Sequence, residues 1–318
     1  MPTPSTPTSL RKGSPMLDTG GLLVEDAATR IIPRRYQGAR CQRRAEQYAK
    51  EAAKRFEGRR LEEITTDDLV HYANVCEAAG NAPATINLKL TFYSTLFDEF
   101  AGELRNPLDR RFPFHAPKIP WRTQAKVPKW WLKPELEPKV LKWCLEHGEH
   151  DLADFISFIT HTGCRVEETL RLQRDHFNFE AGEMTIPGTK TDGAERTVPL
   201  FSEALGIAKH RLRHAGNDGF LFHFSPSDAR VVAIEAFVAR SYEVIKKKWR
   251  GVRIAFGLTR IKTATPKALR RTFARRANDN GMPTEMLRQY LGHEDIATTI
   301  EYLRLIGGYT EQMRKYIS

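Results

Sequence analysis

The sequence has no long uncharged apolar run, which excludes a membrane-spanning helix of about 20 apolar residues. Its first fifteen residues, MPTPSTPTSLRKGSP, lack the apolar core of a signal peptide. Their Pro, Ser and Thr content is typical of disorder, and we predict a disordered or irregular tail over residues 1–35. A soluble cytoplasmic protein without a membrane partner is expected.

Cysteine is scarce, and several common enzyme motifs are missing. The four cysteines include no Cys-x-x-Cys pair, so neither a zinc site nor a disulfide framework is indicated, and a reducing compartment fits. The chain has no Walker A sequence, no HExxH, no GxSxG and no internal repeat. The chemistry must therefore come from other residues.

Acidic residues are absent from two segments of a chain whose net charge is +11. Residues 250–276 contain nine Lys or Arg, and residues 116–130 contain four, among them Arg122 and Lys126. A basic balance by itself can simply keep a protein soluble. Because the charge is clustered, we predict a nucleic acid partner, with Arg122 and Lys126 as contacts to its phosphate backbone.

The length favours about two domains. Helical spacing at 38–56, a Thr65–Asp68 capping pair and an apolar stripe after Pro83 predict a helical domain over 36–115. These helices alone are equally consistent with an ordinary bundle. The segment 116–130 has three prolines and is predicted to be a stiff linker.

A second domain is predicted over residues 131–318. Residues 134–147, 151–161 and 227–249 have helical patterns, whereas EMTIP and RTVPL flank a turn that contains Lys190 and predict a β-hairpin within 183–200. The expected fold class is mainly α with a small antiparallel β-sheet.

Residues 265–305 gather the side chains with the clearest chemical use, Lys267, Arg270, Arg271, His293 and Tyr302. Arginine forks hold a phosphodiester with paired hydrogen bonds, and a tyrosine hydroxyl can attack phosphorus to form a covalent intermediate. Arg165 adds a further guanidinium at a predicted helix start.

These motifs resemble the tyrosine recombinase (phage integrase) family over about residues 36–318. The family's first box, TGxRxxExLxL, is matched by TGCRVEETLRL at 162–172, and its hairpin lysine by Lys190. Its second box, HxxRHTF, is matched by KALRRTF at 267–273, and LGH at 291–293 is followed nine residues later by Tyr302. Lys267 departs from the pattern, because histidine is commonest there. The helix after Pro83 is similar to part of the family's core-binding domain, which assigns 36–115 to that domain and 131–318 to the catalytic domain with its C-terminal tail.

The resemblance implies strand cleavage by Tyr302 through a 3′-phosphotyrosyl bond with release of a 5′-hydroxyl. Arg165 and Arg270 would clamp the phosphate, and Lys190 would protonate the leaving oxygen. His293 would bind a non-bridging oxygen or assist the tyrosine proton, and Lys267 would add charge and orient the phosphate. No ATP, metal or other cofactor is implied.

Each residue also has an ordinary structural interpretation. Arg165 could pair with Glu167 or Glu168, Lys190 could be an exposed turn lysine, and His293 a helix-end residue. Tyr302 lies seven residues before Tyr309, which in turn lies seven before Tyr316, so it could belong to an apolar stripe. Their joint occurrence favours the enzyme. Arg271, Arg275 and Arg276 are predicted to be contacts to the DNA backbone or part of a solvated face rather than catalysts.

The leading hypothesis is a site-specific recombinase for integration, excision or resolution. Its implied partners are double-stranded DNA, a tetramer of the chain on paired DNA sites, and accessory DNA-bending proteins, in the cytoplasm at the nucleoid. A DNA-relaxing enzyme of the topoisomerase IB type is the first alternative. A DNA-binding protein of the same fold that has lost cleavage is the second, and the substitution at Lys267 is the argument for it.

Overall fold

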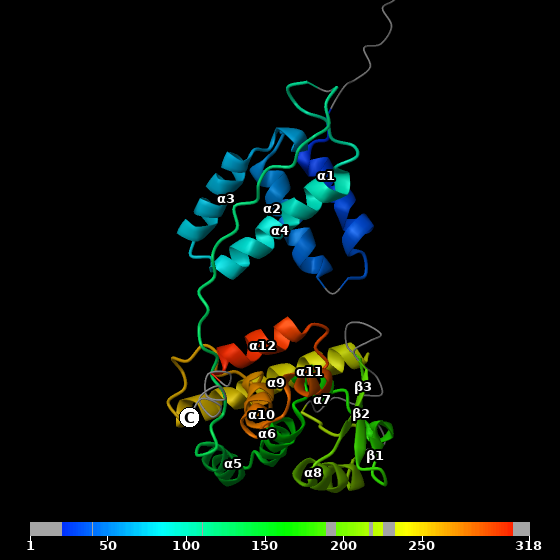
Figure 1. Ribbon diagram of the computed structural model, residues 1–318, viewed down its shortest axis with the longest axis vertical. Helices are drawn as coiled ribbons and strands as arrows, with labels where there is room; N and C mark the ends of the chain where they lie inside the picture. The colour runs from blue at the N-terminus through cyan, green and yellow to red at the C-terminus, as the bar shows by residue number, and fades with distance from the viewer. Residues whose placement is uncertain are drawn as a thin grey trace, which may run out of the picture. The chain divides into compact units, whose positions relative to one another are not determined.

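The computed structural model describes residues 21–39, 41–109, 111–188, 195–215, 219–224 and 233–307. They form two compact units that divide between Ala125 and Lys126, inside the segment predicted to be the linker (Figure 1). No helix of these residues is long and apolar enough to cross a membrane.

The N-terminal unit is helical. Its elements are α1 (Val24–Ile31), a π-helical turn (Ile32–Tyr36), α2 (Gln42–Arg55), a 3-10 turn (Leu61–Glu63), α3 (Thr66–Ala78) and α4 (Pro83–Phe100). The apolar stripe predicted for α4 is buried and forms much of the core of this unit, at Ile86, Leu90, Tyr93, Phe97 and Phe100. The predicted cap of α3 is also present, because Thr65 Oγ1 accepts from Asp68 N at 3.2 Å and Thr65 N donates to Asp68 Oδ2 at 2.9 Å.

The predicted tail over residues 1–35 is wrong at its C-terminal end. Residues 24–31 form α1, and Val24, Ala27, Ala28 and Ile31 are buried in the N-terminal core. These four residues recur at three- and four-residue spacing, so one face of a short helix is apolar. The helix is stable because α2 and α4 cover that face.

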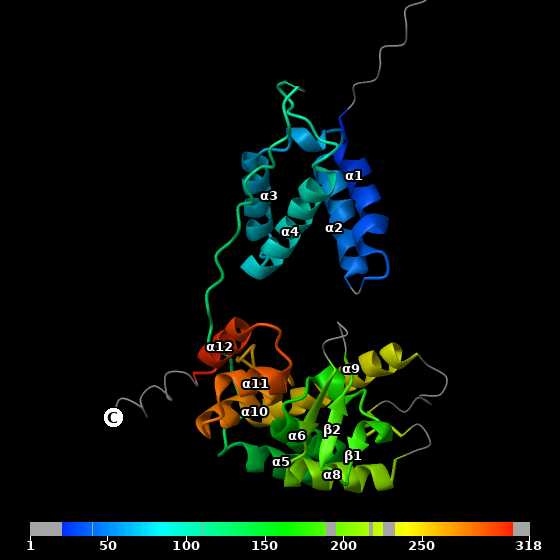
Figure 2. The same ribbon diagram turned by 45° about the vertical axis from the view of Figure 1, so that its right-hand side comes forward.

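The second unit contains α5 (Glu137–Glu146), α6 (His150–Thr162), α7 (Val166–Thr169), a 3-10 turn (Arg174–His176), β1 (Phe177–Asn178), β2 (Glu183–Ile186), β3 (Arg196–Pro199), α8 (Ser202–Arg213), α9 (Ile234–Ala255), α10 (Ala268–Asp279), α11 (Thr284–Leu291) and α12 (Ile296–Leu305). Helix α6 is the centre of its core and packs against α5, α8 and α10 (Figure 2). The apolar sequence of α6 is explained by these neighbours on several sides.

The small sheet is antiparallel in the order β1-β2-β3. Met184 pairs with Val198, and both are buried together with Ile186, as alternation in a one-sided sheet requires. The predicted hairpin and fold class are confirmed, and β1 is an additional short strand. Lys190 lies outside the described residues.

Candidate active site

Four of the six predicted catalytic residues lie together, although they come from distant parts of the chain. Arg165 immediately precedes α7, Arg270 lies on α10, His293 follows α11 and Tyr302 lies on α12. Arg270 Nη2 is 3.3 Å from His293 Nε2, and the rings of His293 and Tyr302 meet edge to face at 5.7 Å between centroids. Helices α10, α11 and α12 pack against one another (Figure 1).

Gly163 turns the chain from α6 toward Arg165. It has a φ of +64°, and a Cβ built there would lie 2.5 Å from Phe273 Cδ1, so only glycine satisfies both the backbone and the packing. Its carbonyl accepts from Arg270 Nη1 at 2.9 Å. The glycine of the first box therefore links the chain reversal to the position of Arg270, one of the arginines predicted to be catalytic.

Glu168 is the buried anion of the site. Arg165 Nη1 donates to Glu168 Oε1 at 2.5 Å, Arg196 Nη2 donates to Oε2 at 3.0 Å, and Arg270 Nη1 lies 3.7 Å from Oε2. Burial works to raise the pKa of this carboxyl, but the hydrogen bond from Arg196 and the charges of the three arginines outweigh burial and lower the pKa to about 2. Glu168 is therefore ionised at neutral pH.

Arg165 and Arg270 differ in accessibility. The Arg165 side chain is 42% exposed, whereas the Arg270 side chain is 7% exposed and also donates to the Leu291 carbonyl at 2.5 Å. Burial, followed by the charge of Arg165, lowers the pKa of Arg270 to about 10, which leaves it charged at neutral pH. Arg270 is thus a fixed cation, and Arg165 is open to an incoming phosphate.

His293 is held between two partners. Its Nδ1 lies 2.9 Å from Thr299 Oγ1, and its Nε2 faces Arg270. Because Arg270 can only donate, Nε2 is the acceptor and the proton resides on Nδ1. Burial, followed by the charges of Arg270, Arg165 and Arg196, lowers the pKa of His293 to about 4, so the imidazole is neutral at neutral pH.

Tyr302 lies partly buried beside these cations. Burial raises the pKa of its hydroxyl, against the opposing influence of the positive charges of Arg270, Arg271 and Arg165. A hydroxyl with a raised pKa must lose its proton to an acceptor as it attacks.

The structure does not bring Lys267 into contact with this group. Lys267 is exposed immediately before α10 and makes no hydrogen bond or ion pair with other described residues. Its place at the start of the helix that carries Arg270 nevertheless leaves its ammonium group accessible from solvent.

Arg122 and Lys126, two of the predicted DNA contacts, differ in the bonds that they make with other residues of the chain. Arg122 interacts with Asn74 and lies 3.4 Å from Glu77, whereas the Lys126 side chain is 73% exposed and 3.2 Å from Glu301. Lys126 can exchange this exposed ion pair for a phosphate at little cost.

Arg271 and Arg275 are corrections to the predicted set. Both are buried: Arg271 donates to the Trp130 carbonyl at 2.7 Å and to the Thr263 carbonyl at 3.1 Å, and Arg275 donates to the Ile306 carbonyl at 3.0 Å. If one of these guanidiniums left its carbonyl partners to bind DNA, buried carbonyl oxygens would lose their hydrogen bonds, which is costly. Their hydrogen bonds instead connect α10 to the segments that contain Trp130, Thr263 and Ile306.

Two residues of the site were missed from the sequence as site members. Glu168 was considered only as an ordinary ion-pair partner of Arg165, and that pairing is present. Arg196 was not singled out at all. A carboxylate three residues after the first-box arginine was an available signal for Glu168, but no pattern in the sequence links Arg196 to it.

The arrangement suits a phosphodiester, because two guanidiniums, a neutral imidazole and a phenol lie in one cluster and a buried carboxylate pairs with the arginines. Such fixed cations stabilise charge that develops on phosphoryl oxygens. Among the described residues, no group of three or more His, Cys, Asp or Glu side chains could hold a metal ion.

Known proteins share both sequence and fold with this chain. Tyrosine recombinase XerA of Pyrococcus furiosus is 25% identical over 256 residues, which cover 78% of this chain and 79% of that protein. The transposase from transposon Tn916 of Enterococcus faecalis is 26% identical over 266 residues, covering 77% of this chain and 64% of the transposase.

Solved structures show the same fold. The Tn1549 transposon integrase in complex with a circular intermediate DNA superposes with a TM-score of 0.70 at 18% identity, covering 89% of this chain and 95% of that one. A lambda integrase dimer bound to a COC′ core site gives 0.66 at 16% identity, covering 92% and 81%.

The sequence profile of the phage integrase family matches residues 131–306, which include all six predicted catalytic positions. The match spans more than half of the chain and the whole of the site just described. The chain therefore belongs to the phage integrase family and is a tyrosine-type site-specific recombinase that acts on DNA by breaking and rejoining strands.

Proposed function

We propose that Tyr302 is the nucleophile of this recombinase. Its oxygen attacks the scissile phosphorus, a 3′-phosphotyrosyl bond forms, and the bond to the 5′-oxygen breaks, with a proton completing the released 5′-hydroxyl. The observation that carries this proposal is the contact of the Tyr302 ring with His293, which in turn lies against Arg270. Reversal of the step with another 5′-hydroxyl rejoins the strand without ATP.

Arg165 and Arg270 clamp the non-bridging oxygens. Arg270 is fixed by the carbonyls of Gly163 and Leu291, and Arg165 is fixed on one side by Glu168 while the rest of its fork is accessible. Two planar forks that are held before substrate arrives lose little freedom when they bind a phosphate.

His293 acts as a neutral hydrogen-bonding group. A pKa of about 4 leaves the imidazole neutral at neutral pH, and donation from Arg270 favours the tautomer without a proton on Nε2. Nε2 then accepts from the tyrosine hydroxyl in place of the 3.3 Å contact with Arg270, which stays bonded to the carbonyls of Gly163 and Leu291. The negative charge of a bound phosphate would raise that pKa and strengthen the acceptor. Lys190 as general acid and Lys267 as an additional cation complete the proposed set.

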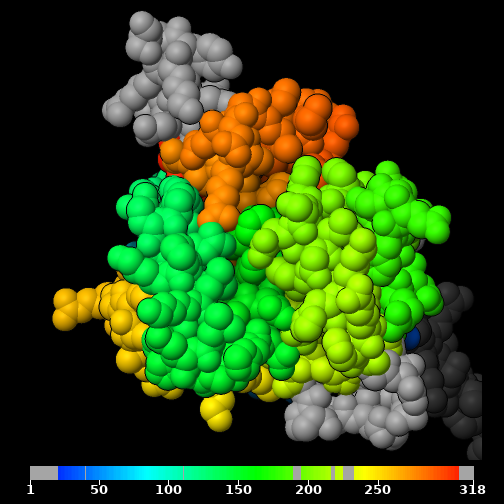
Figure 3. Space-filling view, turned by 90° about the horizontal axis from the view of Figure 1, so that it is seen from below, coloured from blue at the N-terminus to red at the C-terminus, as the bar shows by residue number. Residues whose placement is uncertain are grey.

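DNA contact is proposed for two basic surfaces, each described within its own unit. Helix α2 exposes Arg43, Arg44, Lys50, Lys54 and Arg55. In the second unit, the segment that follows α9 exposes Arg260 and Lys262 and protrudes in gold at the edge of Figure 3. Lys126 extends the second surface, and exposed cations of this kind are the ones that neutralise phosphates.

The proposed assembly is a tetramer of the chain on paired DNA sites, with accessory DNA-bending proteins as additional partners and the nucleoid as its location. The support is chemical: exchange between two duplexes requires four strand cleavages, and one chain has one Tyr302.

A suicide duplex tests the nucleophile. A duplex from the DNA that flanks the gene is nicked near the crossover, so that cleavage releases a short fragment and cannot reverse. The wild type should give a covalent protein–DNA band on a denaturing gel, and Tyr302→Phe should give none while binding the same duplex. A band that survives in Tyr302→Phe would assign the nucleophile to another tyrosine.

The same preparation distinguishes recombination from relaxation. Wild-type protein should exchange strands between two labelled duplexes, whereas an enzyme that only relaxes supercoiled plasmid would lose topological links and leave the two labels separate. That outcome would contradict the proposed assembly on paired sites.

A further inference from the structure

We infer that Arg196, at the start of β3, is a positioning residue for strand cleavage that acts through Glu168. This inference rests on the proposed function, because it assigns Arg196 to the support of the same phosphate clamp. The Arg196 side chain is 11% exposed and so has little access to DNA itself.

The contacts of Arg196 join three separate parts of the site. Its Nη2 donates to Glu168 Oε2 at 3.0 Å, and its Nε donates to the Tyr290 carbonyl at 2.9 Å. A Cβ placed on Gly292 would lie 3.1 Å from both Cδ and Nη1 of Arg196, so this side chain packs directly on the turn before His293. One guanidinium therefore connects the first box, the hairpin and the histidine turn.

The location of Arg196 on the hairpin adds to this connection. Arg196 pairs with Ile186 at the loop end of the β2–β3 ladder. Held on two sides by Glu168 and by the end of α11, it fixes the base of the hairpin against the arginine clamp.

Glu168 transmits the effect to the phosphate. Its Oε1 accepts from Arg165 Nη1 at 2.5 Å, and its Oε2 accepts from the Arg165 backbone N at 2.8 Å. If Arg196 is removed, the Glu168 carboxylate loses the hydrogen bond to its Oε2. The carboxylate can then rotate, or Arg165 and Arg270 can shift toward it to replace the lost positive charge. The clamp is then misplaced, although both catalytic arginines remain in the chain.

Arg196→Met retains most of the side-chain volume and removes the charge and the donors. With saturating protein and a nicked suicide duplex from the DNA that flanks the gene, we expect the single-turnover cleavage rate to fall about 100-fold, the size of effect that a misplaced reacting group produces. The affinity for the intact duplex should not change. A wild-type cleavage rate in Arg196→Met would overturn the inference.

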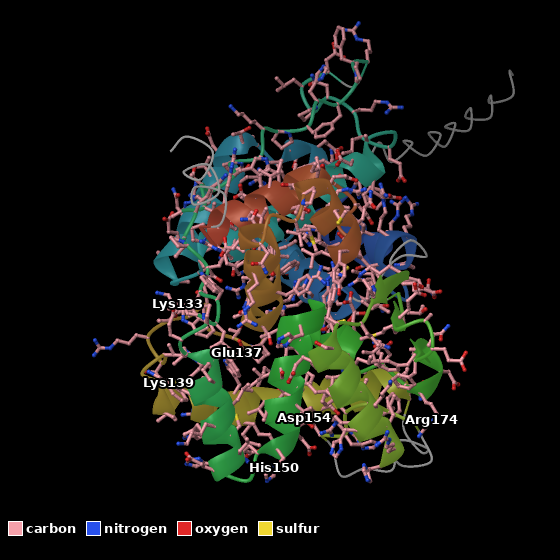
Figure 4. All side chains as sticks on the ribbon, turned by 60° about the horizontal axis from the view of Figure 1, so that its bottom comes forward. Lys133, Glu137, Lys139, His150, Asp154 and Arg174 are labelled. Carbon is pink, nitrogen blue, oxygen red and sulfur yellow. The ribbon has the colours of Figure 1, made fainter. Side chains whose placement is uncertain are left out.

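Arg211→Met is the matched control. Arg211 has the same pattern of bonds, with Nε on the Leu221 carbonyl at 2.9 Å and its two Nη atoms on Asp154 at 2.9 Å and Asp151 at 2.8 Å. Asp154 and its neighbour His150 lie on α6 in Figure 4. Loss of Arg211 should lower the melting temperature as much as loss of Arg196 and leave cleavage unchanged. Equal losses of cleavage in both variants would contradict a positioning role.

Two further readouts separate positioning from stability. The double variant Arg196→Met/Glu168→Gln should cleave within about twofold of the slower single variant, because the two residues act as one unit. A scissile methylphosphonate, which lacks the negative charge, depends less on the clamp and should reduce the Arg196→Met defect to less than about tenfold. If the rate losses of the two single variants multiply in the double variant, or if the Arg196→Met defect is as large on the methylphosphonate as on the phosphodiester, then Arg196 does not act through Glu168.

Arg196→Lys covers the case in which Arg196→Met does not fold. Lysine keeps the charge but cannot bridge Glu168 and the Tyr290 carbonyl with a planar fork, so cleavage should still be slower than wild type. A wild-type rate in Arg196→Lys would overturn the bridging role. Wild-type protein that binds DNA and forms no covalent band would instead overturn the proposed function, and this inference with it.

Discussion

At the scale of single residues, the site is a balance between several cations and one buried anion. Arg165, Arg196 and Arg270 surround Glu168, and the positive charge that remains suits a phosphate with one negative charge. Removing Glu168 would leave three guanidiniums facing one another. The three arginines compensate the buried charge of Glu168, and Glu168 in turn reduces the repulsion among the arginines.

The pH dependence of stability should report this balance. The pKa of Glu168 falls from its ordinary 4.5 to about 2 in the folded protein, so its contribution is complete above about pH 4.5 and disappears as the pH falls toward 2. Between these limits the wild type should lose roughly 3 kcal/mol more unfolding free energy than Glu168→Gln does. Urea unfolding at a series of pH values measures the difference.

Glu285→Gln is the control for this experiment. The pKa of Glu285 is also lowered to about 2, first by the hydrogen bond from Arg288, but Glu285 is exposed and its ion pair is screened by water. Its removal should leave the pH profile close to that of the wild type. A profile that is equally steep in the wild type and in Glu168→Gln would contradict the role given to Glu168.

At the scale of elements, the end of α6 determines where the first-box arginine begins. Gly163 terminates the helix in a left-handed conformation, packs on Phe273 of α10 and presents its carbonyl to Arg270. Gly163, which has no side chain, thus contributes to the end of α6, to the packing between α6 and α10, and to the position of the Arg270 guanidinium.

A comparison of Gly163→Ala with Gly148→Ala separates two contributions to the loss of stability, the clash with a packed side chain and the strain of a left-handed backbone. Both glycines have positive φ, +64° and +70°, but a Cβ at Gly148 meets no atom within 4 Å. Gly148→Ala should cost about 1–2 kcal/mol for the left-handed backbone, and Gly163→Ala should cost about 1–3 kcal/mol more for the clash with Phe273. Chemical denaturation measures both, and equal costs would show that Phe273 moves aside freely.

At the scale of the whole molecule, the charge is distributed over two units that have separate cores. The N-terminal unit exposes basic residues along α2, and the second unit exposes them after α9. In the second unit, Lys133 and Lys139 flank Glu137 around the start of α5 (Figure 4), and Glu137 itself binds Arg276 in the interior. The exposed charges are therefore available to a partner, whereas the buried Glu137 is paired within the fold.

The salt dependence of DNA binding should identify the exposed set. Lys50 and Lys54 lie one turn apart on α2, and the double change Lys50→Gln/Lys54→Gln should reduce the slope of log K against log salt by about 2. Lys142→Gln, whose side chain is 77% exposed on α5 beside Glu146, should leave the slope unchanged. Fluorescence anisotropy with labelled duplex gives the slope, and equal slopes in all three proteins would exclude α2 from the DNA contact.

Much of the fold and the site could be predicted from local patterns. The stripe of α4, the capped start of α3, the hairpin strands and the catalytic boxes each depend on residues that are close in sequence. Helix α1 was missed because eight residues beside a Pro- and Ser-rich segment give too short a periodic signal. Its stability comes from α2 and α4, which lie later in the chain.

The sequence by itself determined the residue types, their order and their spacing, and these were sufficient for the family and for the chemistry of arginine, histidine and tyrosine around a phosphate. Only the tertiary structure decided which arginines stay accessible to solvent and which are buried in the fold. Arg271 and Arg275 lie one turn apart on α10, and helical periodicity places them on one face without showing what covers it. Carbonyls of Trp130 and Ile306 cover that face, whereas Arg165 remains open and Arg196 is drawn to Glu168, because burial and pairing depend on segments far apart in sequence.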